Sequence, residues 1–424
     1  MTFDSIITIA AFCCYLIFML CIGMYFVGKN RTTNEYFLGG RQLGSWVTGL
    51  SAQASDMSGW LLMGLPGAAY LSGISAGWIA IGLAIGTYLN WLFVAKRLRQ
   101  YTKTADDAIT LPQFFKNRFH DESGWISVIA AVFILVFFLF YTASGFVSCA
   151  KLFSSVFGIP YLVSLVIGAV VVISYTFAGG FFAVCWTDFF QGILMFFCVL
   201  AVPTIAIFSM GGPTEFFSQV EAFNPNFLNM FVDGATGVPY TAMGIISLLA
   251  WGLGYFGQPH ILVRFMGISS PQAIKKSRRI ATIWVLISLT AAIMIGISGR
   301  MFLGDSIVLT DGNQETIYIS MVAKIFPVFI AGIFLSAILA AIMSTADSQL
   351  LVTASALTED FYHNKVHKNA SEKELMWVSR GCVMAVAIIA VLIATNQNST
   401  ILGLVSYAWG GFGSAFGPLV LCSL

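Results

Sequence analysis

Charged residues are scarce in this sequence of 424 residues, because Asp, Glu, Lys and Arg together make up only 9% of it. Soluble domains carry about 25% charged residues, so the composition excludes an ordinary soluble domain. Hydrophobic residues reach 58%, and the mean hydropathy is +0.86. The sequence therefore indicates an integral membrane protein that lies in a lipid bilayer.

Motifs for enzyme chemistry are also missing. The sequence has no Ser-His-Asp order, no Gly-x-Ser-x-Gly elbow and no phosphate-binding loop, so hydrolysis and ATP coupling have no visible machinery. Its eight cysteines form no Cys-x-x-Cys pair, which argues against a zinc site or a disulfide framework. The net charge of +2 gives no reason to expect a nucleic-acid partner. We therefore expect a protein that is not an enzyme.

Long hydrophobic segments recur from end to end, and each is long enough to cross a hydrocarbon core of about 30 Å as a helix. The first is preceded by Asp4 instead of a basic region, so we expect it to remain as a membrane helix. The prediction is an all-α fold of about eleven spans: 4–28, 43–70, 74–95, 124–157, 161–178, 185–210, 239–265, 277–303, 318–358, 375–395 and 399–422.

Basic residues gather in alternate loops, which sets the expected orientation. They include Lys29, Arg31 and Arg41 in one loop and Arg264 with 275–279 in another. The loop 211–238 lies on the opposite side and carries acidic residues without a basic one. Cytoplasmic loops are enriched in Lys and Arg, so the N-terminus is predicted outside and the C-terminus inside. Arg41 lies at the cytoplasmic mouth of the second span, where orientation by positive charge is the preferred interpretation, and attracting ions or locking an inner gate is the alternative.

Acidic residues inside the apolar spans are the first functional candidates. Asp56 lies in the middle of the uncharged run 43–66, where an ionised group costs several kcal/mol. A structural helix cap is the alternative, but we favour a role with a cation. Asp188 is expected to open the sixth span, where capping is the preferred interpretation and an ion-path role the alternative. Asp347 is the third such acid.

Two spans contain Gly- or Pro-rich interruptions at corresponding places. The second carries Ser-Asp-Met-Ser-Gly at 55–59, and the seventh carries Trp-Gly-Leu-Gly-Tyr-Phe-Gly-Gln-Pro at 251–259. Gradient-driven transporters bind substrate at such discontinuous helices. Each interrupted span opens a block of five helices, so the second block is inverted relative to the first. The expected divisions are 1–42, an extra helix with its loop; 43–210, the first repeat; 211–238, an extracellular loop; and 239–424, the second repeat.

The sequence resembles the solute:sodium symporter family, and within it the bacterial sodium/proline symporters. The resemblance covers essentially the whole chain and is carried by four blocks: 54–60, 176–188, 251–260 and 341–348. It implies the LeuT-type five-plus-five inverted-repeat fold with one extra N-terminal helix. It also implies a multi-pass protein of the bacterial plasma membrane with sodium as the co-transported ion.

A sodium site is predicted where the ninth span meets the break in the second. Ala341, Ser344 and Thr345 are spaced i, i+3 and i+4, so they share one helix face and offer two hydroxyl oxygens. Sodium is a hard cation that favours oxygen ligands. The resemblance implies a site formed by these residues with the carbonyls of Ala54 and Met57. In the alternative interpretation, the two hydroxyls bond to their own helix.

A substrate carboxylate would suit the half-helix N-terminus at Ser58 and Gly59, where a break would present N–H groups. The resemblance adds aromatic and proline positions that line a proline pocket: Tyr141, Trp251, Tyr255 and Pro259. The ordinary alternative is that these rings are core or interfacial aromatics, since the chain has 38 Phe, 14 Tyr and 10 Trp.

The expected function is therefore inward sodium flow coupled to L-proline uptake by alternating access. Two alternatives stay open: a sodium symporter for another small solute, such as pantothenate, a sugar or another amino acid, and a transporter-like sensor. In related symporters, an acid at the position of Asp188 can bind a second sodium together with hydroxyls of the ninth span, which would be Ser344 and Ser348 here. Asp347 stands where some relatives have a hydroxyl, so we predict one sodium.

Overall fold

The structure is a computed structural model that describes residues 3–27, 32–176, 180–304, 309 and 313–424. Positions 177–179 of the motif at 176–188 lie outside the described residues, as do Lys29 and Arg31 of the first basic loop. The described residues form helices and two isolated β-bridges without a sheet, which confirms the all-α prediction.

Eight uninterrupted helices form most of the bundle: α1 (Phe3–Val27), α8 (Trp125–Phe157), α9 (Tyr161–Thr176), α10 (Phe181–Ser209), α14 (Ile274–Leu303), α16 (Val328–Ser355), α17 (Glu372–Ala394) and α18 (Ile401–Ser423). By length and composition, the described residues contain eight candidate membrane spans, together with shorter apolar helices over Tyr161–Ser174 and Ala242–Gly257. Each predicted span overlaps a helix of the structure.

Other helical stretches are interrupted by turns of a different pitch. The second span consists of α3 (Ser45–Gly59), η2 (Trp60–Gly64) and α4 (Leu65–Ser72). The third consists of η3 (Gly73–Ala76), α5 (Gly77–Leu89), η4 (Asn90–Val94) and α6 (Ala95–Thr104). The seventh consists of α12 (Ala242–Leu249), η6 (Ala250–Gly257) and α13 (Pro259–Gly267). After α16 the chain continues as the π-helix η9 (Ala356–Val366).

Short helices connect these long ones: α2 (Thr33–Leu38), η1 (Gly39–Arg41), α7 (Leu111–Arg118), α11 (Pro213–Phe223), η5 (Pro225–Leu228), η8 (Asn313–Thr316) and α15 (Ile317–Ile325). The predicted ninth span was wrong at its start. It included 318–327, but α15 ends at Ile325 and α16 begins after Pro327. Proline has no N–H to donate to the preceding turn, so the two helices are separate.

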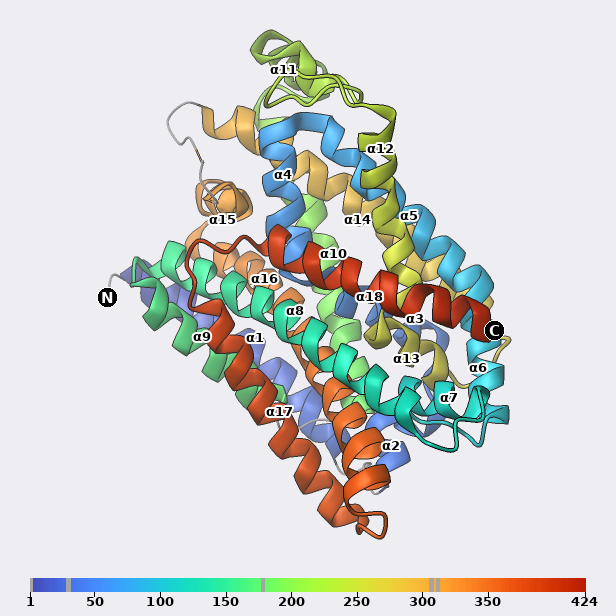
Figure 1. Ribbon diagram of the computed structural model, residues 1–424. Helices are drawn as coiled ribbons and strands as arrows, with labels where there is room; N and C mark the ends of the chain where they lie inside the picture. Colours follow the sequence, from blue (N-terminus) through green and yellow to red (C-terminus); the bar gives the residue numbers. More distant parts are fainter. Residues whose placement is uncertain (1–2, 28–31, 177–179, 305–308, 310–312) are drawn as a thin grey trace.

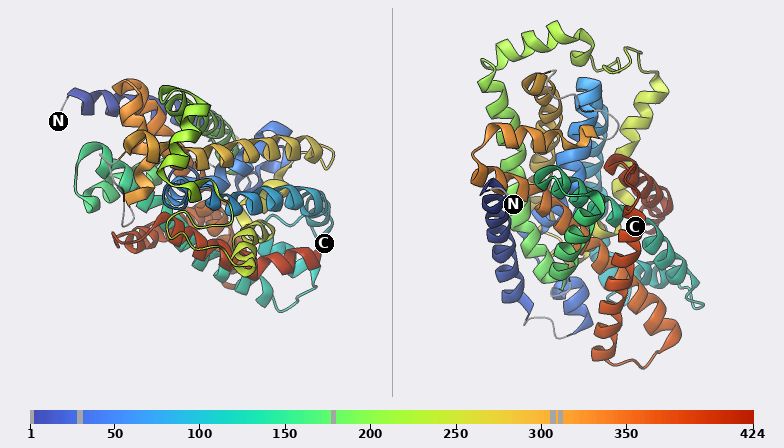
Figure 2. Two further views of the ribbon diagram at one scale, coloured as in Figure 1. Left: turned by 90° about the horizontal axis from the view of Figure 1, so that it is seen from above. Right: turned by 90° about the vertical axis from the view of Figure 1, so that its left-hand side faces the viewer.

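The helices with the functional candidates lie inside the bundle (Figures 1 and 2). The interrupted α3 packs against α10, α14 and α16, while α18 packs on η6 and α8. Helix α9 lies at the periphery and exposes Leu162, Val166 and Val170, as expected for a helix that faces lipid. The candidate residues of α3 and α16 and Tyr255 of η6 are therefore buried within the bundle, whereas Trp251 of η6 is only partly buried.

The two ends of the bundle differ in their connections. Helix α11 lies at one end, and the turn between η9 and α17 lies at the opposite end with α2 and α7 (Figures 1 and 2). Lys116, Lys365 and Lys368 belong to the end that carries α7 and η9. The acidic loop and the basic loops of the sequence therefore lie at opposite ends of the molecule.

Candidate functional site

The second span breaks at Ser58, close to the place that the sequence predicts. Ser58 has φ 47° and ψ −169°, a conformation that L side chains rarely adopt and that costs of order 1–3 kcal/mol. Its side-chain oxygen accepts a hydrogen bond from the N–H of Trp60 at 3.1 Å. Gly59 packs so closely on α8 that an added Cβ would lie 2.5 Å from Ser148 Oγ. Ser58 therefore caps the second half of the helix by accepting the N–H of Trp60.

Asp56 lies on the first half of the same helix and is 4% exposed. Its carboxylate Oδ2 accepts a hydrogen bond from the Tyr255 hydroxyl at 2.5 Å. Its backbone carbonyl accepts another from the Tyr141 hydroxyl at 2.9 Å. The structure thus brings together three predicted site residues from α3, η6 and α8, and the two tyrosines hold Asp56 from different sides.

The seventh span breaks between Gly257 and Pro259. Gln258 adopts an extended backbone with φ −83° and ψ 105°, and Pro259 begins α13 as its first residue. In an α-helix the carbonyl of Tyr255 would accept the N–H of residue 259, but proline has none. Asn90 Nδ2 donates to this carbonyl instead, at 3.0 Å. Pro259 therefore shapes the break.

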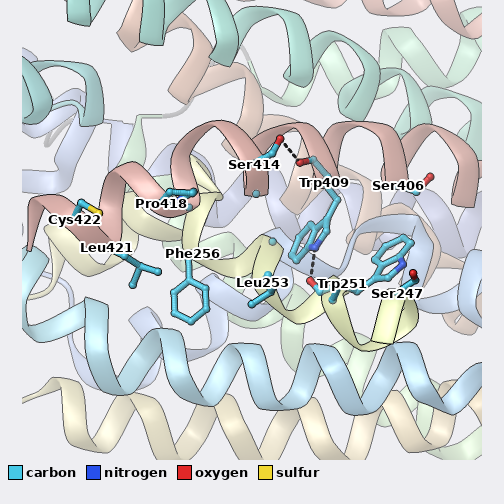
Figure 3. Close-up of a pocket in the computed structure, with 15 residues that line it drawn as sticks. Ser247, Trp251, Leu253, Phe256, Ser406, Trp409, Ser414, Pro418, Leu421 and Cys422 are labelled. Carbon is cyan, nitrogen blue, oxygen red and sulfur yellow. Dashed lines mark hydrogen bonds between the residues drawn. The ribbon is translucent and has the colours of Figure 1, made fainter. Parts of the chain in front are cut away.

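Two further carbonyls at this break receive side-chain donors. Trp409 Nε1 donates to the Trp251 carbonyl at 2.7 Å, a contact visible in Figure 3. Gln258 Nε2 donates to the Gly254 carbonyl at 3.1 Å. Irregular backbone at membrane depth needs such internal partners because no water is available in the hydrocarbon region. The break in η6 is consequently held by N–H donors from η4, from α18 and from the side chain of Gln258 that follows η6.

Aromatic rings enclose a small cavity beside Asp56. The rings of Trp60 and Trp251 stack with centroids 5.9 Å apart, and Tyr255 packs edge-on against Trp409 at 5.0 Å. The cavity has a volume of about 10 Å³, close to the space of one water. Its lining residues are these: Asp56, Met57, Trp60, Leu83, Tyr141, Trp251, Tyr255, Val405 and Trp409. Three predicted substrate residues line it, whereas Ser58, Gly59 and Pro259 do not.

A larger groove lies on the other side of the Trp251 and Trp409 pair. It has a volume of about 750 Å³ and runs between η6 and α18, where Leu253, Pro418 and Leu421 contribute to its walls (Figure 3). Its lining is mainly apolar and includes Gly410 and Gly413. Its lining residues include no Asp, Glu, Lys, Arg or His, so the charged candidate for substrate recognition, Asp56, belongs to the small cavity.

The predicted sodium ligands converge where α16 crosses α3. Ser344 Oγ lies 2.8 Å from the carbonyl of Ala54 and 3.2 Å from the carbonyl of Ala341. Thr345 Oγ1 is buried and has no hydrogen-bond partner among the described residues. The Met57 carbonyl accepts the N–H of Trp60. Three of the five oxygens are thus adjacent, and Thr345 supplies a buried oxygen that needs a partner, as an oxygen-rich cation site requires.

Asp188 does not cap a helix, so the preferred interpretation of this residue was wrong. Helix α10 begins at Phe181 with Gly180 as its N-cap, which places Asp188 two turns inside. Its carboxylate Oδ2 binds Arg264 Nη2 at 3.0 Å and accepts the Ser51 hydroxyl at 2.7 Å. Apolar residues of α10 lie on both sides of Asp188. The sequence therefore contains no sign of where the helix begins, and the predicted start at 185 was too late.

Arg264 was wrongly counted among the basic loop residues. Its side chain and that of Asp188 are both 0% exposed. The guanidinium also binds Ser51 Oγ at 3.1 Å, the carbonyl of His260 at 2.7 Å and the hydroxyl of Ser348. Its partners come from α3, α10, α13 and α16, and a charge-only orientation rule could not reveal them because it ignores pairing.

Asp347 lies at the same buried cluster. Its Oδ1 lies 3.3 Å from Ser348 Oγ, which in turn donates to the carbonyl of Ser344 at 2.7 Å. Asp347 Oδ2 and Asp188 Oδ1 are buried without hydrogen-bond partners in the described part of the chain. The Ser348 hydroxyl, which the resemblance links with a second sodium, therefore contacts the Arg264 guanidinium.

Arg41 is buried at the end of the bundle that carries α2 and α7. Its guanidinium binds Asp107 Oδ1 at 3.0 Å, the carbonyl of Met266 at 2.7 Å and the carbonyl of Ala108 at 3.0 Å. Burial lowers the pKa of the Arg41 guanidinium, and the charge of Asp107 opposes that shift. These bonds join the loop before α3 to the end of α13 and to the segment after α6.

Several residues of the site were missed from the sequence. Trp60 stands inside the block 54–60, so its place in that motif could have identified it. Trp409, Leu83 and Asn90 carry no such signal, because only the folded chain brings α5 and α18 to the cavity and the break. A spacing pattern within one helix cannot report a partner on another helix.

Comparison with known families and proteins gives consistent matches. Residues 36–424 match the Sodium:solute symporter family. The High-affinity proline transporter PutP of Bacillus subtilis (strain 168) is 49% identical over 406 residues, which cover 96% of this chain and 84% of that protein. The Sodium/proline symporter of Escherichia coli (strain K12) is 48% identical over 419 residues, which cover 98% of this chain and 82% of that protein.

Solved structures share the fold at lower sequence identity. A Na+-coupled sialic acid symporter in a substrate-bound outward-open state gives a TM-score of 0.79 at 23% identity, covering 96% of this chain and 86% of that one. MhsT in complex with L-phenylalanine gives 0.56 at 15% identity, covering 89% and 87%. These likenesses support the predicted LeuT-type fold class and go no further than the fold.

Proposed function

Because the chain belongs to the sodium:solute symporter family, we propose that it couples the inward flow of sodium to the uptake of L-proline. It is a multi-pass membrane transporter and not an enzyme. Relatives named as sodium/proline symporters or proline transporters match nearly the whole chain at 48–49% identity. The observation that carries the proposal is the meeting of the Ser344 hydroxyl with the Ala54 carbonyl at a helix break next to Asp56.

Sodium binds, in this proposal, among the oxygens of Ala54, Met57, Ala341, Ser344 and Thr345. The Ser344 hydroxyl can turn its proton away from the carbonyls and offer a lone pair to the ion. Thr345 Oγ1 then gains a partner that it otherwise does not have in the described chain. Since these oxygens come from α3 and α16, a bound cation would hold the two helices together.

L-proline binds at the aromatic cavity beside Asp56. Tyr141, Trp251 and Tyr255 supply faces for an apolar ring, and a protonated amine gains from such faces through the cation–π effect. The N-terminal end of the second half of the broken helix, at Ser58 and Gly59, attracts the substrate carboxylate. Proline does not fit into about 10 Å³, so the stacked indoles of Trp60 and Trp251 must separate before it enters.

Asp56 couples the two sites because it belongs to the same break as the Ala54 carbonyl. Its carboxylate is held by the Tyr255 hydroxyl and its carbonyl by the Tyr141 hydroxyl. A sodium ion that fixes α3 also fixes the residues to which these tyrosines bind. Binding of one solute then favours binding of the other, and the coupling is reciprocal.

Orientation and gating complete the proposal. Because cytoplasmic loops are enriched in Lys and Arg, we propose that the N-terminus lies outside in a bacterial plasma membrane and that the end with Arg41 faces the cytoplasm. The bonds from Arg41 to Asp107, Met266 and Ala108 close that end, and we assign Arg41 to an inner gate. The two repeats are 43–210 and 239–424, with 211–238 as an extracellular loop and 1–42 as the additional N-terminal segment.

Uptake of labelled L-proline into proteoliposomes tests this function, with and without an inward sodium gradient. We expect accumulation that requires sodium and reaches one sodium per proline when labelled sodium is counted. Proline accumulation without sodium would refute the coupling. Sodium-driven uptake of another solute in place of proline would refute only the substrate assignment.

Asp56→Asn tests the central residue in the same assay. Asparagine keeps a neutral acceptor for the Tyr255 hydroxyl but removes the charge. Hydrogen bonds to charged groups contribute about 1.5–3 kcal/mol and neutral ones about 0.5–1.5 kcal/mol, so sodium-dependent uptake should fall about tenfold. Glu221→Gln is the matched control, because Glu221 lies exposed on α11, far from both breaks in the sequence and outside the cavity lining. Equal uptake by both variants would remove Asp56 from the mechanism.

A further inference from the structure

The carbonyl of Tyr255 has a side-chain partner in place of a backbone one. Pro259 follows four residues later and has no N–H, so the ordinary α-helical bond to this carbonyl cannot form. Asn90 Nδ2 donates to it at 3.0 Å from the neighbouring helix. The amide of Asn90 therefore supplies the hydrogen-bond donor that Pro259 cannot supply to the Tyr255 carbonyl.

Helices α5 and η6 approach so closely that only glycine fits between them. A Cβ on Gly86 would lie 2.1 Å from the carbonyl oxygen of Gly252, and a Cβ on Gly82 would lie 2.4 Å from that of Leu249. Gly82, Gly86 and Asn90 are spaced i, i+4 and i+8, so they lie near one face of α5 and of η4, which continues it. Two backbone contacts, at Leu249 of α12 and Gly252 of η6, and one side-chain hydrogen bond consequently fix the junction of α12 and η6 against this face.

Asn90 stands at a change of helical pitch. The π-helix η4 begins at this residue, and such turns are frequent at functional positions. The side chain is 0% exposed, and its Oδ1 has no hydrogen-bond partner within the described residues. A buried amide with one satisfied and one unsatisfied end is costly, which points to a role for the donated bond beyond packing.

We propose that Asn90 is a positioning residue of the substrate site. By holding the Tyr255 carbonyl, it sets the place of η6 so that the Tyr255 hydroxyl reaches Asp56 Oδ2. It does not line the cavity, so it acts on the substrate only through Tyr255. This role rests on the proposed uptake of proline at that cavity.

Asn90→Ala and Asn90→Leu test the role in proteoliposomes. Both variants remove the amide donor. Leucine has a branched side chain of similar shape to asparagine, so Asn90→Leu does not leave the cavity that Asn90→Ala leaves, and a loss of proline affinity in both variants cannot come from a cavity alone. We expect the proline concentration for half-maximal uptake to rise about fivefold, the effect of one lost hydrogen bond. The maximal rate per transporter should change less than about twofold. Unchanged proline affinity in either folded variant would overturn the role.

Asn117→Ala is the matched control. Asn117 Nδ2 also donates to a backbone carbonyl at 3.0 Å, that of Ala105, but it belongs to α7 and does not line the cavity. The proline affinity of this variant should equal that of the unchanged protein. A shift of the same size in Asn117→Ala would show that any lost amide bond suffices, and would overturn the specific role of Asn90.

A double-mutant cycle separates positioning from general stability. Tyr255→Phe removes the hydroxyl through which Asn90 acts, so adding Asn90→Ala to it should not raise the half-maximal proline concentration further. A purely structural effect would instead add to that of Tyr255→Phe and would overturn the proposal. The unchanged protein is assayed beside these variants: if it does not take up proline with sodium, the proposed function itself fails.

Discussion

The two broken helices are stabilised by different chemical groups. At the break in α3, hydroxyl groups approach the freed carbonyls: Ser344 binds that of Ala54, and Tyr141 binds that of Asp56. At the break in η6, nitrogen donors do so, as with Trp409 at the Trp251 carbonyl. A hydroxyl oxygen can exchange its role as donor for that of a cation ligand, whereas an N–H group can only donate.

This difference assigns separate tasks to two segments that look alike in sequence. The break in α3 can release its carbonyl and hydroxyl oxygens together to a sodium ion. The break in η6 keeps its carbonyls bound to N–H donors and presents side chains, including Trp251 and Tyr255, to the cavity. One break is therefore suited to ion binding and the other to holding an aromatic surface in place.

Arg264 connects the two interrupted spans. It extends from α13, the second half of the seventh span, to Ser51 on the first half of the second span, and to Asp188 on α10. All these side chains are buried. These bonds of Arg264 therefore fix the position of the second span relative to the seventh.

Arg264→Met should have the largest effect of the changes considered. It leaves the Asp188 carboxylate buried without its cation, which costs about 3–5 kcal/mol of folding free energy. We expect a lower temperature of thermal inactivation in detergent and a joint loss of sodium and proline affinity. If the affinity for only one solute fell, Arg264 would not be what keeps the two breaks in register.

The double variant Asp188→Asn with Arg264→Met provides the control. Removing both charges avoids the unpaired carboxylate, so much of the lost thermal stability should return. Arg300→Met, at a cation that is not fully buried and stacks on Tyr70, should cost less. Equal stability of the single and double variants would mean that the unpaired Asp188 carboxylate does not cause the loss of stability.

Ser344→Ala should act on sodium more than on proline. Loss of one oxygen ligand should raise the sodium concentration for half-maximal uptake about tenfold, equivalent to about 1.4 kcal/mol. Ser336→Ala is the matched control, since Ser336 lies on the same helix, is equally buried and bonds to the carbonyl of Gly332 in its own helix. If both variants required the same sodium concentration, the hydroxyl at the break in α3 would have no ligand role.

Much of this fold could be predicted because membrane spans leave a long hydrophobic signal. The breaks at Ser58 and Gln258 were also predictable, since Gly and Pro residues interrupt those spans in corresponding places. Helix ends were harder: the apolar run around Asp188 hides where α10 begins, and Pro327 divides what looks like one span.

The candidate site was predictable only where its residues share a helix. Ser344 and Thr345 could be found from their spacing, and the resemblance supplied Tyr141, Trp251 and Tyr255. Arg264 was mistaken for a loop cation because its pairing with Asp188 spans 76 positions of sequence. Asn90 and Trp409 could not be found, since their importance lies in carbonyl groups of another helix.

Trp409→Phe should have the smallest effect and is the sharpest probe of the difference between the breaks. Phenylalanine keeps an aromatic ring beside Tyr255 but cannot donate to the Trp251 carbonyl. That carbonyl belongs to a residue that is only partly buried, so the lost bond should raise the half-maximal proline concentration only about threefold. The sodium requirement should stay unchanged, because no sodium ligand is altered. Trp377→Phe, at an exposed ring on α17, should change neither value. A rise in the sodium requirement comparable to that of Ser344→Ala would mean that both breaks respond to the ion, and the division of tasks between hydroxyl and N–H donors would be lost.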